Sequence, residues 1–165
     1  MSDVKMISLK GIIDEDFVNY RVPSMTLIFP YCSFKCGKDL CQNSDLAKQN
    51  IINIKIDKLC RRYIDNPISE SIVCQGLEPL DSSEELIAFI EKLRHYYHVN
   101  DDVVIYTGYN PDEVENYITA LSTYNNIVVK FGRFVPNQQP HYDEVLGVKL
   151  SSDNQYAVRL NKKES

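Results

Sequence analysis

The sequence predicts an α/β protein with an open, mostly parallel sheet, equivalent to an incomplete (partial) βα barrel. Its candidate strands are continuous apolar runs rather than alternating ones, as expected for strands covered on both faces. Candidate helices alternate with these strands, which is the pattern of βα units. Only four or five such units are present, fewer than a closed eight-stranded barrel needs. With 165 residues, a single domain spanning 1–165 is expected.

Four short apolar runs rich in β-branched residues predict the buried strands. The first is ended by Pro30, the third by Gly108, and the fourth stops near Gly132. The predicted strands are 25–30, 71–75, 103–107 and 126–130.

Two helices are predicted from their start signals. Ser82 with Glu85 three residues later has the pattern of a capping box. Asn110 followed by Pro111 and two acidic residues is a second start signal, because proline fits the first helical position. The apolar residues that follow fall on one helical face in each case: Leu86, Phe89, Ile90 and Leu93 in the first, and Val114, Tyr117, Ile118 and Leu121 in the second.

Two further segments carry weaker patterns. The segment 51–64 predicts a third helix, with the inward residues Ile52, Ile56, Leu59 and Tyr63. The tail from Tyr142 onward predicts extended segments over 145–150 and 155–160 rather than another βα unit.

Charge and hydropathy exclude some functions. The net charge of −5 disfavours a nucleic-acid binder, which normally carries a basic stripe. No apolar run reaches the roughly 20 residues needed to cross a bilayer, and the N-terminus lacks the layout of a secretory signal. We therefore expect a cytoplasmic protein that binds neither nucleic acid nor membrane.

Three cysteines, Cys32, Cys36 and Cys41, directly follow the first predicted strand. They should project from the sheet edge where open α/β folds place their sites. Iron–sulfur clusters are held by cysteine thiolates, commonly four. Three ligands without an obvious fourth would leave one iron open, as in catalytic metal sites.

Zinc binding and the absence of any metal remain open alternatives. Cys60, Cys74 or a histidine could complete a zinc site. The paired Cys-x2-Cys knuckles typical of zinc sites are absent, however, and both Cys60 and Cys74 fall in predicted regular elements, where cysteine acts as a small buried hydrophobe. Spacing alone favours an iron–sulfur cluster.

The Cys-x3-Cys-x4-Cys loop resembles the Cys-x3-Cys-x2-Cys motif of radical S-adenosylmethionine (SAM) enzymes, with two extra residues before the third cysteine. More narrowly, the chain resembles the activating proteins of anaerobic ribonucleotide reductase, a family of glycyl-radical activases. The segment Gln75-Gly76-Leu77-Glu78-Pro79 resembles their Gly-Gly-Asp/Glu-Pro motif, with Leu77 in place of the second glycine. Further resemblances lie at 40–43, 106–109, 112–114, 129–134 and 151–155.

The resemblance implies a partial barrel of the radical SAM type and a defined chemistry. Cys32, Cys36 and Cys41 would ligate a [4Fe-4S] cluster, whose open iron would chelate the amino and carboxylate groups of SAM. Reductive cleavage of SAM would yield methionine and a 5′-deoxyadenosyl radical, which would take a hydrogen atom from a backbone glycine of a partner. No catalytic residue is implied beyond the cluster ligands. The implied cofactor contacts are Leu40, Gln75, Gly76, Leu77, Glu78 and Thr107.

The implied partners are an anaerobic (class III) ribonucleotide reductase or another glycyl-radical enzyme, and a flavodoxin- or ferredoxin-like electron donor. Two other functions remain open. One is a radical SAM enzyme acting on a small molecule, and the other is a non-enzymatic, zinc-stabilised α/β binding module. The short chain has little material to enclose its own substrate, which favours a large partner.

Several residues allow both a functional and a structural interpretation. Glu78 would face the SAM ammonium or bond local backbone, and Thr107 would bond the ribose or the following turn. Lys130 and Arg133 would contact the SAM carboxylate or a partner, or remain solvated charges. Four tyrosines would line an adenine or partner pocket, or serve packing: Tyr20, Tyr31, Tyr106 and Tyr109.

Overall fold

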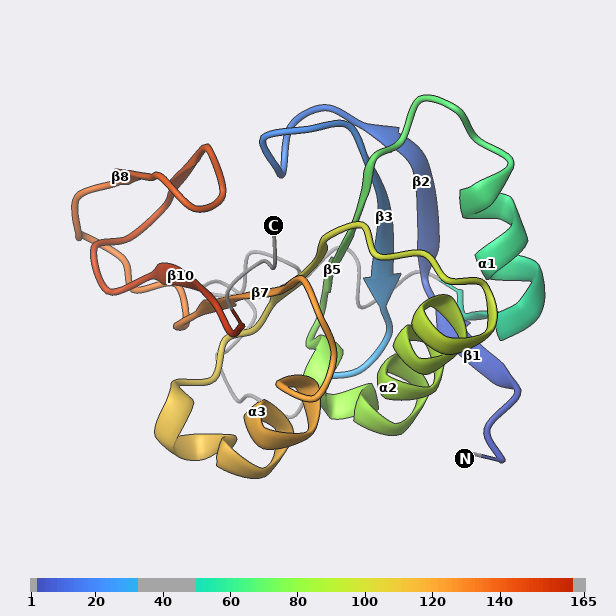
Figure 1. Cartoon of the computed structure of the whole chain (residues 1–165). Coiled ribbons are helices and arrows are strands. Elements are labelled where there is room, and N and C mark those ends of the chain that lie inside the picture. Colours follow the sequence, from blue (N-terminus) through green and yellow to red (C-terminus); the bar gives the residue numbers. More distant parts are fainter. Residues whose placement is uncertain (1–2, 33–49, 162–165) are drawn as a thin grey trace.

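The computed structural model describes residues 3–32 and 50–161 (Figure 1). The strands of these residues are β1 (Met6–Leu9), β2 (Gly11–Asp16), β3 (Ser24–Phe29), β4 (Ile52–Lys55), β5 (Ser71–Gly76), β6 (Val103–Tyr106), β7 (Ile127–Phe131), β8 (His141–Asp143), β9 (Val148–Leu150) and β10 (Tyr156–Arg159). The helices are α1 (Ile56–Ile64), α2 (Ser83–Glu91) and α3 (Glu115–Leu121), with short helical turns at Pro79–Ser82, Lys92–Tyr96 and Pro111–Glu113.

A six-stranded sheet with the order β10-β7-β6-β5-β3-β2 forms the centre of the fold. Its four inner strands, β3, β5, β6 and β7, are parallel, and the edge strands β2 and β10 are antiparallel to their neighbours. These inner strands are the four predicted from apolar runs, so that prediction is confirmed. The sheet ends in two edge strands and does not close into a barrel within the described residues.

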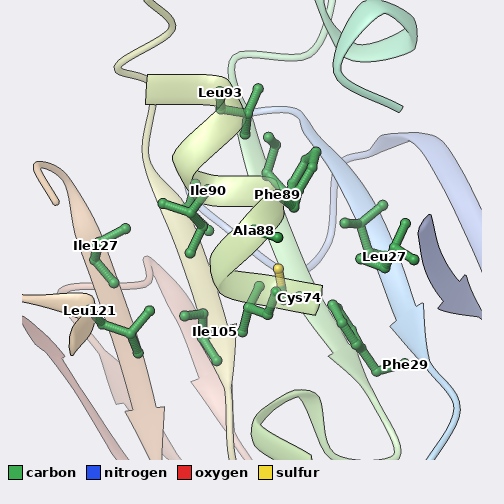
Figure 2. Close-up of a cluster of buried hydrophobic side chains, with 14 of the residues drawn as sticks. Leu27, Phe29, Cys74, Ala88, Phe89, Ile90, Leu93, Ile105, Leu121 and Ile127 are labelled. Atoms are coloured by element: carbon green, nitrogen blue, oxygen red, sulfur yellow. The ribbon is translucent and has the colours of Figure 1, made fainter. Parts of the chain in front are cut away.

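The helices cover one face of this sheet. The inner strands follow one another in a single direction, so their crossovers return on the same side. Figure 2 shows α2 packed over the sheet, with Phe89 and Ile90 directed toward strand residues such as Ile105. Leu27, Cys74 and Ile105 are register partners on adjacent strands and are fully buried beneath the helices.

Among the described residues, irregular chain and a hairpin cover the opposite face. The segment 17–23 between β2 and β3 and the β8–β9 hairpin pack there around Tyr20, Leu146 and Leu150. In Figure 1 the orange β8 segment lies on the left, away from α1 and α2. Tyr106 donates a hydrogen bond from its hydroxyl to the Asn19 carbonyl (2.6 Å), which fixes segment 17–23 to β6.

The predicted helix over 51–64 is wrong in its first part. Residues Ile52–Lys55 form β4, which pairs antiparallel with β1, and Ile52 is 45% exposed. The helix starts only at Ile56, and Ile56, Leu59 and Tyr63 are buried as predicted. The backbone of β4 forms a strand because β1 lies beside it and pairs with it. A helical pattern read from residues 51–64 alone does not reveal this pairing.

The predicted capping box at the start of α2 does not form. The Ser82 hydroxyl is buried without a hydrogen-bond partner among the described residues. Glu85 instead accepts a hydrogen bond from the Ser8 backbone N–H of β1 (2.5 Å). The helical turn Pro79–Ser82 continues directly into α2. Glu78 caps the start of this turn, because its side chain accepts a hydrogen bond from Leu80 N–H.

The extended tail predicted after Tyr142 is confirmed as β9 and β10, separated by turns. In the part of the chain that the structure describes, none of the helices has the length and apolar character required to traverse a bilayer.

Candidate functional site

A cavity of about 610 Å³ lies at the carboxyl ends of the parallel strands, on the face opposite α1, α2 and α3. Open α/β sheets bind ligands at this edge, and the volume suits a small-molecule ligand. Six predicted site residues line it: Cys32, Gln75, Gly76, Leu77, Glu78 and Thr107. The other predicted site residues, Leu40, Cys36 and Cys41, lie outside the described residues.

Cys32 is half-buried three residues beyond the end of β3. It lines the main cavity and also a second, shallower one, which it shares with Leu77, Tyr31 and Asp81. The first predicted cluster ligand is therefore on the rim of the cavity. Its thiol is accessible to a metal centre at the start of the cysteine loop.

Cys60 and Cys74 are fully buried in the core beneath the helices. Burial raises the pKa of the Cys60 thiol to about 12 and also raises that of Cys74. Thiolates are the metal-binding form, so neither side chain is suited to complete a site with Cys32. The prediction that both are small buried hydrophobes is confirmed, and the zinc site that would use them loses its support.

Glu78 is completely buried and joins the ends of β5 and β6. One of its carboxylate oxygens, Oε2, accepts from the Thr107 hydroxyl (2.8 Å) and from Leu80 N–H (3.1 Å). The other oxygen, Oε1, accepts from Gly108 N–H (2.8 Å). Thr107 in turn accepts from Tyr109 N–H (3.1 Å). Both polar side chains are thus engaged within the protein, and together they shape the wall of the cavity.

Burial raises the pKa of Glu78 to about 7, although its hydrogen bonds from Gly108, Thr107 and Leu80 act in the lowering direction. The folded chain should hold a proton on Glu78 between pH 4.5 and 7 that the unfolded chain has lost. The contribution of Glu78 to stability is therefore present below pH 4.5 and is lost as the pH rises to 7. Its full size is on the order of 3 kcal/mol.

We expect the free energy of unfolding, measured by urea denaturation, to fall across this pH range. The variant Glu78→Gln, which keeps the size and stays neutral, should flatten that part of the curve. The carboxyls of Asp16 and Asp14 have pKa values held below the ordinary range. Their titration therefore changes the stability at lower pH and does not obscure the slope between pH 4.5 and 7. An identical slope in the wild type and the variant would contradict the assignment.

Gly76 ends β5 with φ of +104°, in the left-handed region that favours glycine. A Cβ atom at this position would lie 2.6 Å from the Phe29 backbone nitrogen. The next residue, Leu77, donates its N–H to the Phe29 carbonyl (3.1 Å). The close approach of β3 and β5 thus requires glycine and places the 76–78 turn beside the beginning of the cysteine loop.

Lys130 projects from β7 into the cavity and is only 6% exposed. Its ammonium donates to the Gly132 carbonyl (2.9 Å) and lies 5.8 Å from the centre of the Tyr106 ring. Gln155 donates to the same carbonyl through Nε2 (3.2 Å) and accepts from Ser152 N–H through Oε1 (3.1 Å). The interpretation of Lys130 as a solvated charge is wrong, because the wall formed by Gln155 and Tyr106 covers it.

Arg133 also lines the cavity, and it forms an ion pair with Glu113 (3.2 Å). The four predicted tyrosines separate by role. Tyr106 lines the cavity, Tyr31 lines the shallower one, Tyr20 is a core residue, and the Tyr109 hydroxyl donates to Asp81 (2.6 Å).

A comparison with known protein families matches residues 21–157 to the 4Fe-4S single cluster domain. The chain belongs to this family. A search among curated proteins finds no match. The match includes the cysteine loop and every strand that contributes to the cavity, and iron–sulfur binding is the function that the family supports.

A 4Fe-4S single cluster domain needs thiolates at one place, and the described residues supply Cys32 at the cavity rim. Among residues 3–32 and 50–161, no group of three histidine, cysteine or acidic side chains is arranged to hold a metal ion. Cys32 therefore fits a cluster together with ligands from the cysteine loop, which is where Cys36 and Cys41 stand in the sequence.

Part of the cavity wall in this 4Fe-4S single cluster domain was not predicted from sequence. Val18 and Asn19 reach it from the β2–β3 segment, and Pro136 and Val148 from the chain after β7. Of the cavity-lining residues after Pro136, Ser151 and Gln155 lie in the segment 151–155, which resembles the activases in sequence. The bonds of Gln155 to Gly132 and Ser152 give that signal a physical basis.

Proposed function

We propose that this protein is a SAM-dependent activating enzyme of the radical SAM type. Its substrate would be the backbone glycine of a partner anaerobic (class III) ribonucleotide reductase or another glycyl-radical enzyme. The observation that carries the proposal is the convergence of Cys32, the 75–78 turn and Thr107 on one cavity. These segments are far apart in the sequence, and the activase resemblance assigns each of them to the site.

The strand order supports a partial radical SAM barrel. In a doubly wound sheet the order reverses and helices cover both faces. Here β3, β5, β6 and β7 follow in one direction, and the face opposite the helices holds the cavity. This is the arrangement of a section of a βα barrel, whose ligands lie at the carboxyl ends of its strands.

The cofactors would supply the radical chemistry: the reduced cluster would donate the electron that cleaves SAM to methionine and a 5′-deoxyadenosyl radical. The chain would supply binding and shape. Cys32 would be one cluster ligand, with Cys36 and Cys41 completing the set. The 75–77 backbone would offer carbonyl acceptors to the SAM ammonium.

Glu78 would act on SAM indirectly. Its two oxygens already accept three hydrogen bonds within the protein, so its role would be to hold the 107–108 turn in place. Tyr106 and segment 17–23 would exclude water from the inner side of the cavity, because the Tyr106–Asn19 hydrogen bond holds that segment over the sheet.

A protein partner would complete the site. The net charge of −5 and the small size of the chain suit a subunit that works against a larger protein rather than against nucleic acid. The electron would come from a flavodoxin- or ferredoxin-like protein.

The decisive experiment is anaerobic reconstitution of the full chain with iron and sulfide, followed by addition of SAM and dithionite. We expect a brown, EPR-active protein that releases 5′-deoxyadenosine and methionine in equal amounts. Glycyl-radical formation on a class III reductase would then be measured by EPR. Stoichiometric zinc in place of iron would contradict the proposal in favour of a binding module. 5′-Deoxyadenosine release with no glycyl radical on any such reductase would point to a small-molecule substrate.

A further inference from the structure

The chain that follows β7 forms part of the cavity wall outside any strand. The ladder between β7 and β10 ends at the pair Phe131–Tyr156, and residues 132–136 lie in no helix or strand of the described chain. Backbone N–H and carbonyl groups outside a ladder need other hydrogen-bond partners. Four residues of this stretch line the cavity: Gly132, Arg133, Phe134 and Pro136. Contacts other than a strand ladder must therefore hold this wall.

Side chains of the turn before β10 supply the missing partners. Gln155 donates through Nε2 to the Gly132 carbonyl (3.2 Å). Asn154 donates through Nδ2 to the Arg133 carbonyl (2.9 Å). Continuing the antiparallel register of β7 and β10 by two residues places each of these side chains opposite the residue that it bonds. The two side-chain amides thus take the places of ladder bonds, and an amide offers the same kinds of donor and acceptor as a peptide group.

The turn is itself held by further hydrogen bonds. The Ser152 hydroxyl accepts from Val135 N–H (3.3 Å) and donates to Asn154 Oδ1 (2.7 Å). Gln155 Oε1 accepts from Ser152 N–H (3.1 Å), and the Gln155 carbonyl accepts from the His141 imidazole (2.6 Å). Ser152 is fully buried, and Gln155 is 5% exposed. Side chains whose rotamers are fixed in this way can hold a neighbouring wall in one position.

The Gly132 carbonyl connects this turn to the interior of the cavity. It accepts from the Lys130 ammonium (2.9 Å) as well as from Gln155, so the position of the carbonyl also sets the position of Lys130. Gly132 has a φ of +103°, in the region that favours glycine. A Cβ atom there would lie 3.1 Å from Asn154 Nδ2, so the lack of a side chain at Gly132 lets Asn154 approach the wall.

We propose that Asn154 and Gln155 are positioning residues of the candidate site. Their side-chain amides hold the 132–135 wall where the ladder between β7 and β10 has ended, and they thereby fix Lys130 and the shape of the cavity. Both residues act through the backbone carbonyls of the wall. The identity of the bound molecule as SAM rests on the proposed function, whereas the hold on the wall does not.

The first test needs no ligand. Acetic anhydride is added to the folded, metal-free full chain, and mass spectrometry gives the acetylation rate of each lysine. In Asn154→Ala and in Gln155→Met the rate at Lys130 should rise about fivefold or more over the wild type, as expected when one hydrogen bond that keeps the wall closed is lost. The rate at Lys149, an exposed residue of the same cavity, should change by less than about twofold.

The matched control is Gln138→Ala. Gln138 accepts from Asn154 N–H through Oε1 (3.1 Å), so this substitution removes a contact of the same turn and leaves both bonds to the wall. It should change the rate at Lys130 by less than about twofold. An unchanged rate at Lys130 in both test variants, a parallel rise at Lys149, or an equal effect of Gln138→Ala would overturn the proposal. Asn154 is exposed, so Asn154→Ala keeps the test decisive if Gln155→Met does not fold.

A second measurement tests the consequence for the ligand. In the reconstituted chain the Kd for SAM should weaken about fivefold or more in Asn154→Ala and stay within about twofold of the wild type in Gln138→Ala. Wild-type affinity in Asn154→Ala would overturn the positioning role at the site. Absence of SAM binding in the wild type would instead count against the proposed function, while the acetylation rates would still decide whether the turn holds the wall.

Discussion

Replacement of Cys32 by alanine is expected to abolish assembly of the [4Fe-4S] cluster and, with it, all cleavage of SAM. Cys32 is the predicted ligand that stands on the cavity rim, and a cluster that keeps one iron open for SAM has no spare thiolate. The free energy of unfolding of the metal-free chain should change by less than about 0.5 kcal/mol, because Cys32 is only half-buried. Iron content, EPR and 5′-deoxyadenosine release measure the effect. Cys41→Ala should behave in the same way.

Cys74→Ala is the matched control for this prediction. Cys74 is fully buried beneath α2 (Figure 2), so its loss should cost about 1 kcal/mol of stability. The variant should nevertheless bind the cluster and cleave SAM normally. Normal 5′-deoxyadenosine production by Cys32→Ala, or loss of the cluster in Cys74→Ala, would show that the ligands are wrongly assigned.

Gly76→Ala should be the most damaging small change at the cavity. The added methyl group would lie 2.6 Å from the Phe29 nitrogen and 2.9 Å from its carbonyl oxygen, and these backbone atoms cannot rotate away. The residue would also be held at a φ of +104°, which is strained for alanine. Together these effects should lower the free energy of unfolding by about 2–4 kcal/mol. Urea denaturation gives the stability, and equilibrium dialysis gives the SAM affinity, which should fall because the 76–78 turn is displaced.

Gly11→Ala provides the comparison. A Cβ atom at Gly11 would meet only the terminal methyl of the Ile28 side chain, at 3.3 Å, and that side chain can adjust. The loss of stability should stay below about 1 kcal/mol, and SAM affinity should not change. Equal losses in the two variants would mean that the approach of β3 and β5 at Gly76 is not the constraint described above.

The inner strands could be predicted from sequence because each combines a continuous apolar run with a clear stop signal. The same physical reasoning placed Gln75 and Thr107 at one sheet edge, since the carboxyl ends of parallel strands meet there. The start of α1 could not be predicted in this way. Ile52 belongs to a strand only because β1 lies beside it, and that contact joins distant parts of the chain.

The state of the charged residues could not be predicted for a related reason. Whether Lys130 is solvated or buried depends on Tyr106 at the end of β6 and on Gln155 in the turn before β10. Likewise, the hydrogen bonds of Glu78 depend on Thr107 and Gly108, which lie in the turn after β6. Local patterns could single out candidate residues, whereas the partners of those residues depended on the tertiary fold.

The two sides of the central sheet rest on separate sets of apolar contacts. The helices pack on one set, while segment 17–23 and the β8–β9 hairpin pack on a smaller set that includes Val73, Val104 and Val128. Substitutions in segment 17–23 and in the β8–β9 hairpin should therefore change the shape of the cavity and leave the packing of the helices on the sheet intact. Relatives with divergent specificity would be expected to differ first in those stretches.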